Sequence, residues 1–557
     1  MRTKKPLSSG FFYYICKMKL VDYEKINAKG FLIAVALIVA LGIGIQFKYL
    51  NEFPAFIHAW AQDDRYALAI GFLDNGFDLF HPETMIYNKQ FPGWWEEAYD
   101  TTITAVDFPI HEYIVALLMK LFGTTSPWVF RLWTMICSFI GVFFLYKLSY
   151  LITEDFQKSL FVTAIAMTAP VYAYYFNGFL PGIPAFAIGL IGMWSYIKYV
   201  KHYKKKFFHL GILLMALATL MRTSFAIELI AVLGFELLRI FRKESSFADK
   251  LPSVIISFAL IVAYMFWNSH LRSEHGSLFL NELMPADNIT DFRDFLNDAK
   301  NNWEYQYFQK LHYRIFEVLA GLAVIAGIVK LIMKLRGKKD EMAKKKQLTI
   351  WLIPIIYLFG CLLFLIAMIR QFPNHDYYFV DTFFLPILML YALMLSALPR
   401  IKNYVVGGIS LVALCALCYF MISNVNETQV SRRWIEDGAY KTYLNFDGSD
   451  QFLDSLNIPR NAKILSLYAY PQNGSFIQMK RKGYSVMWHK EKIVNPALTW
   501  DFDYIVVENQ VLRNTFEERK DVLGRLCRIA DNGRISVCTL SDTIVCTNPE
   551  EFFAEKQ

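Results

Sequence analysis

Two adjacent acids stand near the start of the chain, in the sequence Asp63-Asp64-Arg65-Tyr66. A carboxylate held close to a reacting hydroxyl group can accept its proton while a new bond forms. A second acid beside it can orient the first or help to bind a divalent cation. The alternative is the first turn of a helix, where acids favour the helix dipole and Arg65 pairs with one of them. The pattern alone leaves both interpretations open.

A divalent metal ion is compatible with the same part of the chain, because hard cations favour carboxylate ligands. Five side chains between residues 51 and 127 are candidate ligands: Asp63, Asp64, His81, Glu83 and His111. They follow no fixed ligand spacing. The sequence therefore admits a metal without demanding one, and it identifies no other cofactor.

The composition places these residues in a membrane protein. Of the 557 residues, 55% are hydrophobic, 17% are aromatic and only 19% are charged. Several apolar stretches reach the length of roughly twenty residues that crosses a bilayer. The net charge of +8 marks cytoplasmic loops in such a protein, so nucleic-acid binding does not follow. The basic start, with the first apolar run near Gly30, indicates an uncleaved signal anchor.

Basic loops orient the apolar segments, because Lys and Arg accumulate on the cytoplasmic side. The four basic loops contain Lys201 and Lys204–Lys206, Arg239–Lys243, Lys334–Lys346, and Arg400 with Lys402. About eleven apolar ranges can span the membrane: 30–50, 128–150, 159–176, 179–200, 207–221, 224–241, 251–269, 313–333, 349–369, 378–398 and 402–422. A cytoplasmic N-terminus then puts all four loops inside and the C-terminal region outside.

The range Phe108–Gly123 is also apolar, but as a helix it is only roughly 24 Å long. Counting it as a span would place the lysine clusters outside. Glu112, Ala116 and Lys120 share one helical face. We therefore predict a juxtamembrane helix that lies in the membrane interface.

The predicted domains are a transmembrane domain of residues 1–424, with residues 51–127 as an outer loop that carries the acidic pair, and an extracytoplasmic α/β domain of residues 425–557. In the second domain, a short helix is expected from Ser449 to Leu456 and a longer one over Leu512–Ala530. Four short strands are expected at Lys463–Tyr468, Tyr484–Trp488, Tyr504–Val507 and Ile535–Cys538. An oxidising compartment would permit one disulfide among Cys527, Cys538 and Cys546.

Four short patches resemble the GT-C superfamily of membrane glycosyltransferases. The acidic pair with Arg65-Tyr66 is similar to the first-loop motif of its protein O-mannosyltransferase and aminoarabinose-transferase branch. Phe108-Pro109-Ile110-His111-Glu112-Tyr113, ending in Leu121-Phe122-Gly123, resembles the juxtamembrane helix of that branch. Arg131-Leu132, and His375-Asp376-Tyr377-Tyr378 with Pro386 farther on, are similar to its later motifs. The resemblance covers residues 30–400 as an architecture.

The resemblance implies an inverting hexosyl- or pentosyltransferase with a polyprenyl-phosphate-linked sugar donor and no soluble nucleotide-sugar site. The acceptor would be a glycan, a lipid such as lipid A, or a protein, and the membrane would be a bacterial inner membrane. Within the pair, Asp64 is the preferred base, because it adjoins the Arg65-Tyr66 that the motif shares. The alternatives are a lipid-linked sugar transporter or flippase, and an O-antigen polymerase or ligase. No inverted repeat favours a transporter. Polymerases and ligases rely on a large late outer loop and not on an acidic pair after the first helix.

The chain departs from this branch at Val106-Asp107, where the branch often has a lysine associated with the donor phosphate. Phosphate binding would then fall to other groups at outer helix ends. The candidates are Arg370, His375, Arg131, Arg222 and Tyr377. Guanidinium groups suit phosphate oxygens, although each arginine could instead be an interfacial residue that reaches toward water. Arg370 and His375 are the preferred pair, because one short loop holds both.

Overall fold

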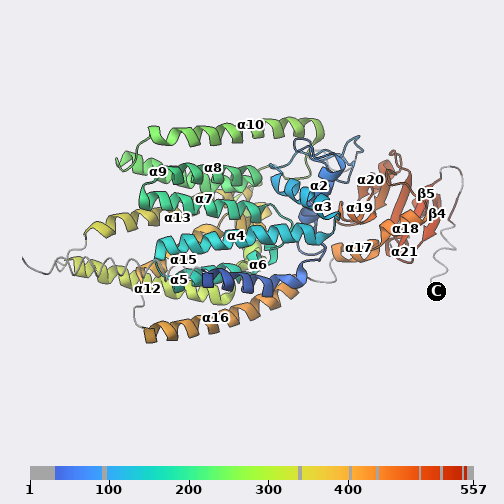
Figure 1. Cartoon of the computed structure of the whole chain (residues 1–557). Coiled ribbons are helices and arrows are strands. Elements are labelled where there is room, and N and C mark those ends of the chain that lie inside the picture. Colours follow the sequence, from blue (N-terminus) through green and yellow to red (C-terminus); the bar gives the residue numbers. More distant parts are fainter. Residues whose placement is uncertain are drawn as a thin grey trace, which may run out of the picture.

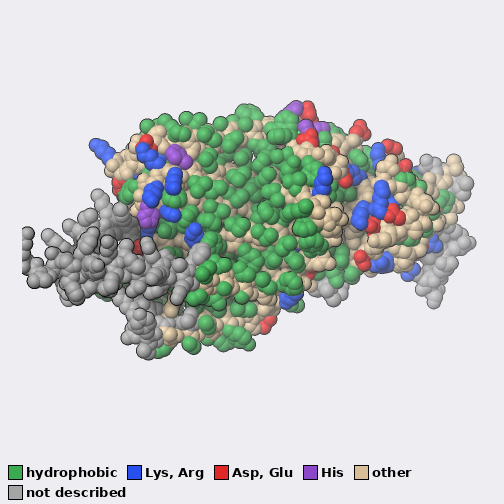
Figure 2. Space-filling model, viewed as in Figure 1, with side chains coloured by type: hydrophobic (Ala, Val, Ile, Leu, Met, Phe, Trp, Pro, Cys, Tyr) green, Lys and Arg blue, Asp and Glu red, His purple; other side chains and the backbone are tan. Residues whose placement is uncertain are grey.

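The computed structural model describes residues 32–90, 97–280, 282–335, 341–399, 404–433, 438–487, 491–514, 519–541, 543 and 545–547. Its long helices lie side by side in one bundle, with a smaller α/β region at one end (Figure 1). A broad apolar belt covers the visible face of the bundle between two charged ends (Figure 2). Within the described ranges, seven helices are long and apolar enough to cross a membrane. The chain is therefore a polytopic integral membrane protein.

Helices occupy every range that was predicted to span. The bundle elements are η1 (Phe47–Tyr49), α2 (Ala59–Asp74), α3 (Ile110–Phe122), α4 (Pro127–Thr153), α5 (Phe156–Met167), α6 (Pro170–Tyr175), α7 (Gly182–His202), α8 (Lys205–Met221), η2 (Thr223–Phe225), α9 (Ala226–Phe241), η3 (Ala248–Lys250), α10 (Leu251–His275), α11 (Ile289–Tyr307), α12 (Lys310–Leu335), α13 (Glu341–Met368), η4 (Ile369–Gln371), α14 (Tyr377–Asp381), α15 (Phe384–Ala397) and α16 (Tyr404–Ser431), and the first span covers Leu32–Tyr49.

Two predicted spans are divided, which corrects the prediction of unbroken helices at 159–176 and 378–398. The first is split into α5 and α6, and the second into α14 and α15. Pro170 starts α6 and Pro386 lies in the first turn of α15. A proline fits the first turn of a helix but not its interior, so each helix restarts there. The split leaves α14 as a helix of five residues.

The short helix α3 lies beside α2, at the end of the bundle nearest the α/β region (Figure 1). It has 13 residues and ends at Gly123, whose φ of 65° suits a glycine after a helix. Leu121 and Phe122 are exposed, at 75% and 50%. The position of α3 in the membrane interface stays a prediction.

The C-terminal region holds a five-stranded mixed sheet in the order β2-β1-β3-β5-β4. β1 pairs in parallel with β2 and β3, whereas β5 is antiparallel to β3 and β4. Its elements are α17 (Gly438–Phe446), α18 (Ser449–Ser455), β1 (Ile464–Leu467), α19 (Gly474–Met479), β2 (Gly483–Val486), α20 (Glu491–Ala497), β3 (Tyr504–Glu508), α21 (Asn509–Asn514), α22 (Lys520–Arg525), β4 (Leu526–Asp531) and β5 (Ile535–Leu540).

The predicted helix Leu512–Ala530 is wrong, because its last residues form β4. β4 pairs with β5 from Leu526 to Asp531, so a partner later in the chain decides the conformation. A disulfide joins Cys527 of β4 to Cys546, and Cys538 is a buried free thiol. The predicted boundary after residue 424 lies within α16, and it stays a prediction.

The loop between α2 and α3 is joined to this sheet. The Tyr87 amide donates to the Gly483 carbonyl at 2.8 Å, and the Gly483 amide donates to the Met85 carbonyl at 3.1 Å. The Asn88 side chain exchanges two hydrogen bonds with the Ser485 backbone, at 2.9 and 2.7 Å. Backbone pairing of this kind holds the α/β region against the end of the bundle that carries α2.

Candidate active site

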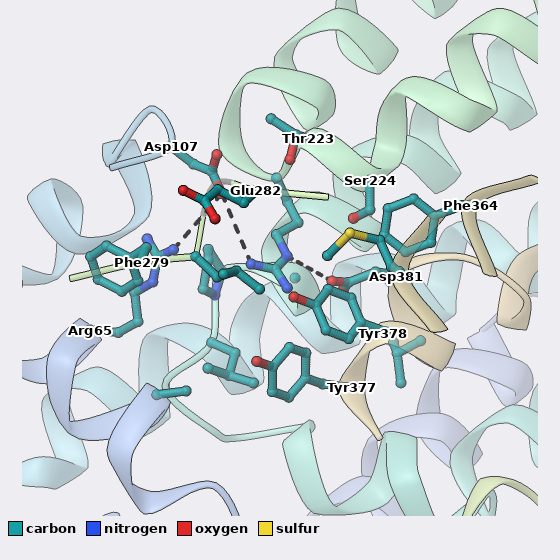
Figure 3. A pocket seen from close by; sticks show the side chains of 18 of the residues that line it. Arg65, Asp107, Thr223, Ser224, Phe279, Glu282, Phe364, Tyr377, Tyr378 and Asp381 are labelled. Atoms are coloured by element: carbon teal, nitrogen blue, oxygen red, sulfur yellow. Dashed lines mark hydrogen bonds and ion pairs between the residues drawn. The ribbon is translucent and has the colours of Figure 1, made fainter. Parts of the chain in front are cut away.

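A cavity of about 470 Å³ lies between α2, the loop at Asp107, the start of α7, the α8–α9 junction, α10 and α14. Its size is that of a small-molecule site. Figure 3 shows charged side chains along one wall, with aromatic rings beside them. The ionisable acids and bases that line it are Arg65, Asp107, Arg222, Arg272, Glu282 and Asp381. Acids and arginines therefore line the same cavity together with apolar side chains.

Arg222 occupies the break between two helices. α8 ends at Met221, and Arg222 follows in extended backbone with φ −155° and ψ 110°. Its Nε donates to Asp381 Oδ2 at 2.7 Å, and its Nη1 lies 4.0 Å from Asp107 Oδ2. Its Nη2 is buried and has no hydrogen-bond partner in the described part of the chain. A buried guanidinium whose Nη2 has no hydrogen-bond partner is suited to an anionic oxygen.

Asp107 lies between two arginines. Its Oδ2 is 3.9 Å from Arg65 Nη2 and 4.0 Å from Arg222 Nη1. Burial raises the pKa of Asp107, and the neighbouring guanidinium groups of Arg222 and Arg65 oppose that rise. Arg65 also donates to Glu112 at 3.1 Å and lies 4.1 Å from the ring centre of Phe279. Opposite charges therefore alternate along this wall of the cavity.

The acidic pair lies within α2, not at its start. α2 begins at Ala59, and its first turn contains no acid. The helix-capping interpretation of Asp63 and Asp64 is therefore wrong. The predicted pairing of Arg65 with one of them is also wrong, because Arg65 turns to Glu112 and Asp107. Both acids of the pair are buried, at 0% and 2% exposure.

Residues from the C-terminal region cover the pair. Asn473 Nδ2 donates to Asp64 Oδ1 at 2.7 Å, and Gln472 Nε2 lies 3.4 Å from the same oxygen. Burial raises the pKa of Asp64 to about 7, against the lowering effect of these amides. Asp63 has no hydrogen-bond partner for either oxygen in the described residues, and burial beside Asp64 raises its pKa well above the usual value. A carboxyl group poised near neutral pH can exchange a proton.

Two of the five predicted phosphate-binding residues line the cavity, namely Arg222 and Tyr377. Arg370 is paired with Asp287 and is 35% exposed at its side chain. His375 stacks on His58 with ring centres 5.5 Å apart, and burial lowers its pKa to about 4. Arg131 donates to the Glu52 carbonyl at 2.6 Å. Neither residue of the preferred pair, Arg370 and His375, is among the residues that line the cavity at Arg222. Their role in phosphate binding stays a prediction.

The five candidate metal ligands do not come together. His81 pairs with Asp78 at 2.7 Å, Glu83 with Lys482 at 2.7 Å, and His111 accepts from Trp133 at 3.2 Å. Within the described residues, no group of three His, Cys, Asp or Glu side chains is placed to hold a metal ion. The predicted ligand set does not fit a metal ion.

The sequence reasoning missed Asp107, Arg272, Glu282 and Asp381 as lining residues. Asp107 had a signal, because it stands where the resembling branch often has a lysine. Asp381 lies four residues beyond Tyr377, so a helical reading of that stretch would have put the two on one face. Arg272 and Glu282 had no signal, because only the path of the chain after α10 brings them to the cavity.

Comparisons with known proteins agree on the architecture. A sequence profile described as dolichyl-phosphate-mannose-protein mannosyltransferase matches residues 107–267. The crystal structure of ArnT from Cupriavidus metallidurans bound to undecaprenyl phosphate is 12% identical, with a TM-score of 0.52 over 92% of this chain and 99% of that chain. The arabinofuranosyltransferase AftD from Mycobacteria is 11% identical, with a TM-score of 0.51 over 93% of this chain and 40% of that chain. No curated protein sequence matches.

Proposed function

This chain has the fold of the GT-C superfamily of membrane glycosyltransferases, and from that fold and its cavity we propose that it transfers a sugar from a polyprenyl-phosphate-linked donor to an acceptor. The ArnT structure with undecaprenyl phosphate supports the donor class. The membrane glycosyltransferase assignment agrees with the family profile over residues 107–267. The sugar, a hexose or a pentose, and inversion at its anomeric carbon are part of the proposal.

The position of Arg222 in the cavity wall carries the proposal. Arg222 lines the cavity, and its buried Nη2 has no hydrogen-bond partner in the described residues, as is also true of Nε of Arg272 in the same lining. A phosphate oxygen beside Nη2 would accept a hydrogen bond from it, while Nε of the same guanidinium donates to Asp381. Arg65 and Arg272 line the same cavity and add positive charge. Its apolar lining, which includes Leu283, suits the isoprenoid part of such a donor.

The transfer is a single displacement. The acceptor hydroxyl oxygen attacks the anomeric carbon, the bond from that carbon to the phosphate oxygen breaks, and the electron pair leaves with the phosphate. The hydroxyl proton passes to a carboxylate, for which we propose Asp64, with Asp63 beside it. Asp64 is held in one orientation by Asn473, and its pKa of about 7 leaves a useful fraction ionised at neutral pH.

Binding of undecaprenyl phosphate to the purified full-length protein tests the donor site. Arg222→Gln should weaken this binding, whereas Arg370→Gln should leave it nearly unchanged. The reverse ranking would return the phosphate to the Arg370 and His375 loop that the sequence favours. Equal binding by both variants and the wild type would contradict a phosphate at either position.

We propose that the membrane is a bacterial inner membrane, with the N-terminus in the cytoplasm and the C-terminal region outside. The positive-inside rule supports this orientation through the basic loop at Lys204–Lys206. Reporter fusions at Lys205 and at the C-terminus should report opposite compartments. Matching compartments would contradict the orientation and the juxtamembrane placement of α3.

A further inference from the structure

The cavity at Arg222 contains as many acids as arginines. The ionisable acids and bases of its described lining are Arg65, Arg222 and Arg272 with Asp107, Glu282 and Asp381. Two of the guanidinium groups are already engaged, because Arg222 Nε donates to Asp381 at 2.7 Å and Arg65 donates to Glu112 at 3.1 Å. The formal charges of this lining therefore cancel. A phosphate that enters the cavity meets no surplus of positive charge, so a second negative charge on it would be poorly compensated.

Asp107 lies beside the end of Arg222 that the donor phosphate would use. Its Oδ2 is 4.0 Å from Arg222 Nη1, and the adjoining Nη2 has no hydrogen-bond partner in the described residues. Dashed lines in Figure 3 mark the contacts of Asp107 with Arg65 and with Arg222. A phosphate oxygen that accepts from Nη2 would lie at most about 9 Å from the Asp107 carboxylate, given a hydrogen bond of about 2.9 Å. The Asp107 side chain is only 15% exposed, so water screens its charge weakly over this distance.

The backbone on both sides of Asp107 is fixed. The Val106 amide donates to Asn268 Oδ1 of α10 at 2.9 Å, and the Phe108 amide donates to the Leu220 carbonyl of α8 at 2.9 Å. Burial raises the pKa of Asp107, and the surrounding guanidinium groups oppose that rise and favour the ionised form. Asp107 therefore holds a negative charge beside the phosphate position, and its short side chain cannot carry that charge far.

The proposed transfer changes the charge of the phosphate. In the donor, the phosphate is a diester with one negative charge. When the bond from the anomeric carbon to the phosphate oxygen breaks, the electron pair leaves with the phosphate, and the hydroxyl proton passes to Asp64. The second pKa of a phosphate monoester is about 6, so the product carries close to two negative charges at neutral pH. A fixed acid near the site repels this product about twice as strongly as it repels the donor.

We propose that Asp107 discriminates the singly charged phosphodiester donor from the doubly charged phosphomonoester product, and that it thereby promotes product release. The inference rests on the proposed function, because it takes the phosphate to bind at Arg222. Asp107 acts through its charge at the phosphate and accepts no proton, so it is a specificity-determining residue. The branch that this chain resembles often has a lysine at this place, which would hold the product instead of repelling it.

The test measures the binding of two lipids to the purified full-length protein in lipid nanodiscs at about pH 8. They are undecaprenyl phosphate, which is doubly charged at that pH, and its methyl phosphodiester, which is singly charged. The wild type and Asp107→Glu should bind the diester more tightly than the monoester. In Asp107→Asn the affinity for the monoester should rise by about tenfold or more relative to that for the diester, and in Asp107→Lys it should rise further. Asp287→Asn, which removes an exposed acid outside the lining, is the control and should leave this ratio unchanged.

Tighter binding of the monoester than of the diester by the wild type would overturn the inference, and this measurement needs no variant. An affinity ratio that stays the same in Asp107→Asn and Asp107→Lys, with both lipids still bound, would also overturn it and would leave the donor site at Arg222 intact. A wild-type protein that binds neither lipid would overturn the inference together with the proposed function. A fall of about hundredfold or more in the single-turnover rate of Asp107→Asn would make Asp107 a proton acceptor and would contradict its role in discrimination.

Discussion

The cavity at Arg222 and the acidic pair of α2 lie close together but differ in how charge is compensated. In the cavity, Arg222 donates to Asp381 at 2.7 Å and also lies 4.0 Å from Asp107. At the acidic pair, neutral amides approach Asp64, and Asp63 has no hydrogen-bond partner in the described residues. Both regions are largely buried, so the difference lies in the neighbours and not in exposure.

This difference separates two chemical tasks. A guanidinium with an unpartnered Nη2 can bind an anion, because the anion accepts the hydrogen bond that no protein group accepts. A buried carboxyl group whose amide partners and neighbouring Arg65 do not offset the cost of burial keeps its proton to higher pH, because ionisation in a low dielectric is costly. The cavity is therefore suited to hold a phosphate, and the acidic pair to exchange a proton.

The largest expected effect comes from Asp64→Asn. Asparagine keeps the shape and the hydrogen bonding but cannot accept a proton, and loss of a general base costs about 10²–10⁴-fold in rate. Sugar transfer in membranes should fall by that factor while the amount of inserted protein stays normal. Asp63→Asn should match it only when the two acids act together. Near wild-type transfer by both single variants and the double variant would remove the acidic pair from the mechanism and leave Asp107 as the next candidate.

Arg222→Gln should have the next largest effect, on donor binding more than on turnover. Loss of a charged hydrogen bond costs about 1.5–3 kcal/mol, which corresponds to about 10–150-fold in affinity. The apparent KM for the lipid donor should rise, with a smaller change in kcat. Asp381→Asn combined with Arg222→Gln is the control, because it removes the buried acid that the single variant leaves unpaired. A donor dependence unchanged in both would contradict a phosphate at Arg222.

The rate of sugar transfer and the stability of the protein should both depend on pH through the raised pKa of Asp64. Because the pKa of Asp64 is about 7, transfer should fall by about tenfold per pH unit below that value, and Asp64→Asn should remove this dependence.

The stability of the protein should fall as the pH rises, whereas the transfer rate rises. The folded protein holds a proton that the unfolded chain releases near 3.8, so the unfolding free energy should fall between about pH 4 and pH 7. A thermal midpoint that rises over this interval in the wild type, relative to Asp64→Asn, would contradict the uncompensated burial.

Asn473→Ala removes a neutral hydrogen-bond donor from Asp64, and it therefore tests how the neighbours of the acidic pair set its pKa. Its amide donates to Asp64 at 2.7 Å, and its own oxygen accepts from the Met85 amide at 3.1 Å. Loss of these bonds should cost about 1–3 kcal/mol of stability and raise the pKa of Asp64 further, so the acidic limb of the pH–rate profile should move to higher pH. Ser455→Ala, at an exposed position of the same region, is the control. A stable variant with an unmoved profile would mean that Asn473 does not act through Asp64.

Arg370→Gln should have the smallest effect. Its ion pair with Asp287 is partly exposed, and pairs of that kind contribute about 0–1 kcal/mol. Donor KM, transfer rate and thermal midpoint should all stay near the wild-type values. A rise in donor KM as large as that of Arg222→Gln would favour the loop of Arg370 and His375 as the phosphate site and would weaken the contrast between the two regions.

The fold was largely predictable from the sequence, because the length and hydropathy of the apolar ranges reflect the thickness of the bilayer. The short length of α3 followed from the sequence, its juxtamembrane position stays a prediction, and the four main strands followed from their composition. The prediction of a helix over Leu512–Ala530 was wrong, because β4 forms by pairing with β5 and a local sequence pattern contains no information about that partner. The divided spans had only weak local signals in Pro170 and Pro386.

The sequence by itself determined that this is a membrane protein with a notable acidic pair, because these properties depend on residue type and local spacing. Only the tertiary structure decided that Arg222, and not Arg370, lines the cavity beside Asp107 and Asp381. It also decided that Asn473, more than 400 positions along the chain, covers Asp64. Burial and hydrogen-bond partners set the pKa of an acid and the free donors of an arginine. Those partners come from distant segments, so the chemistry of both sites arises only when the chain is folded.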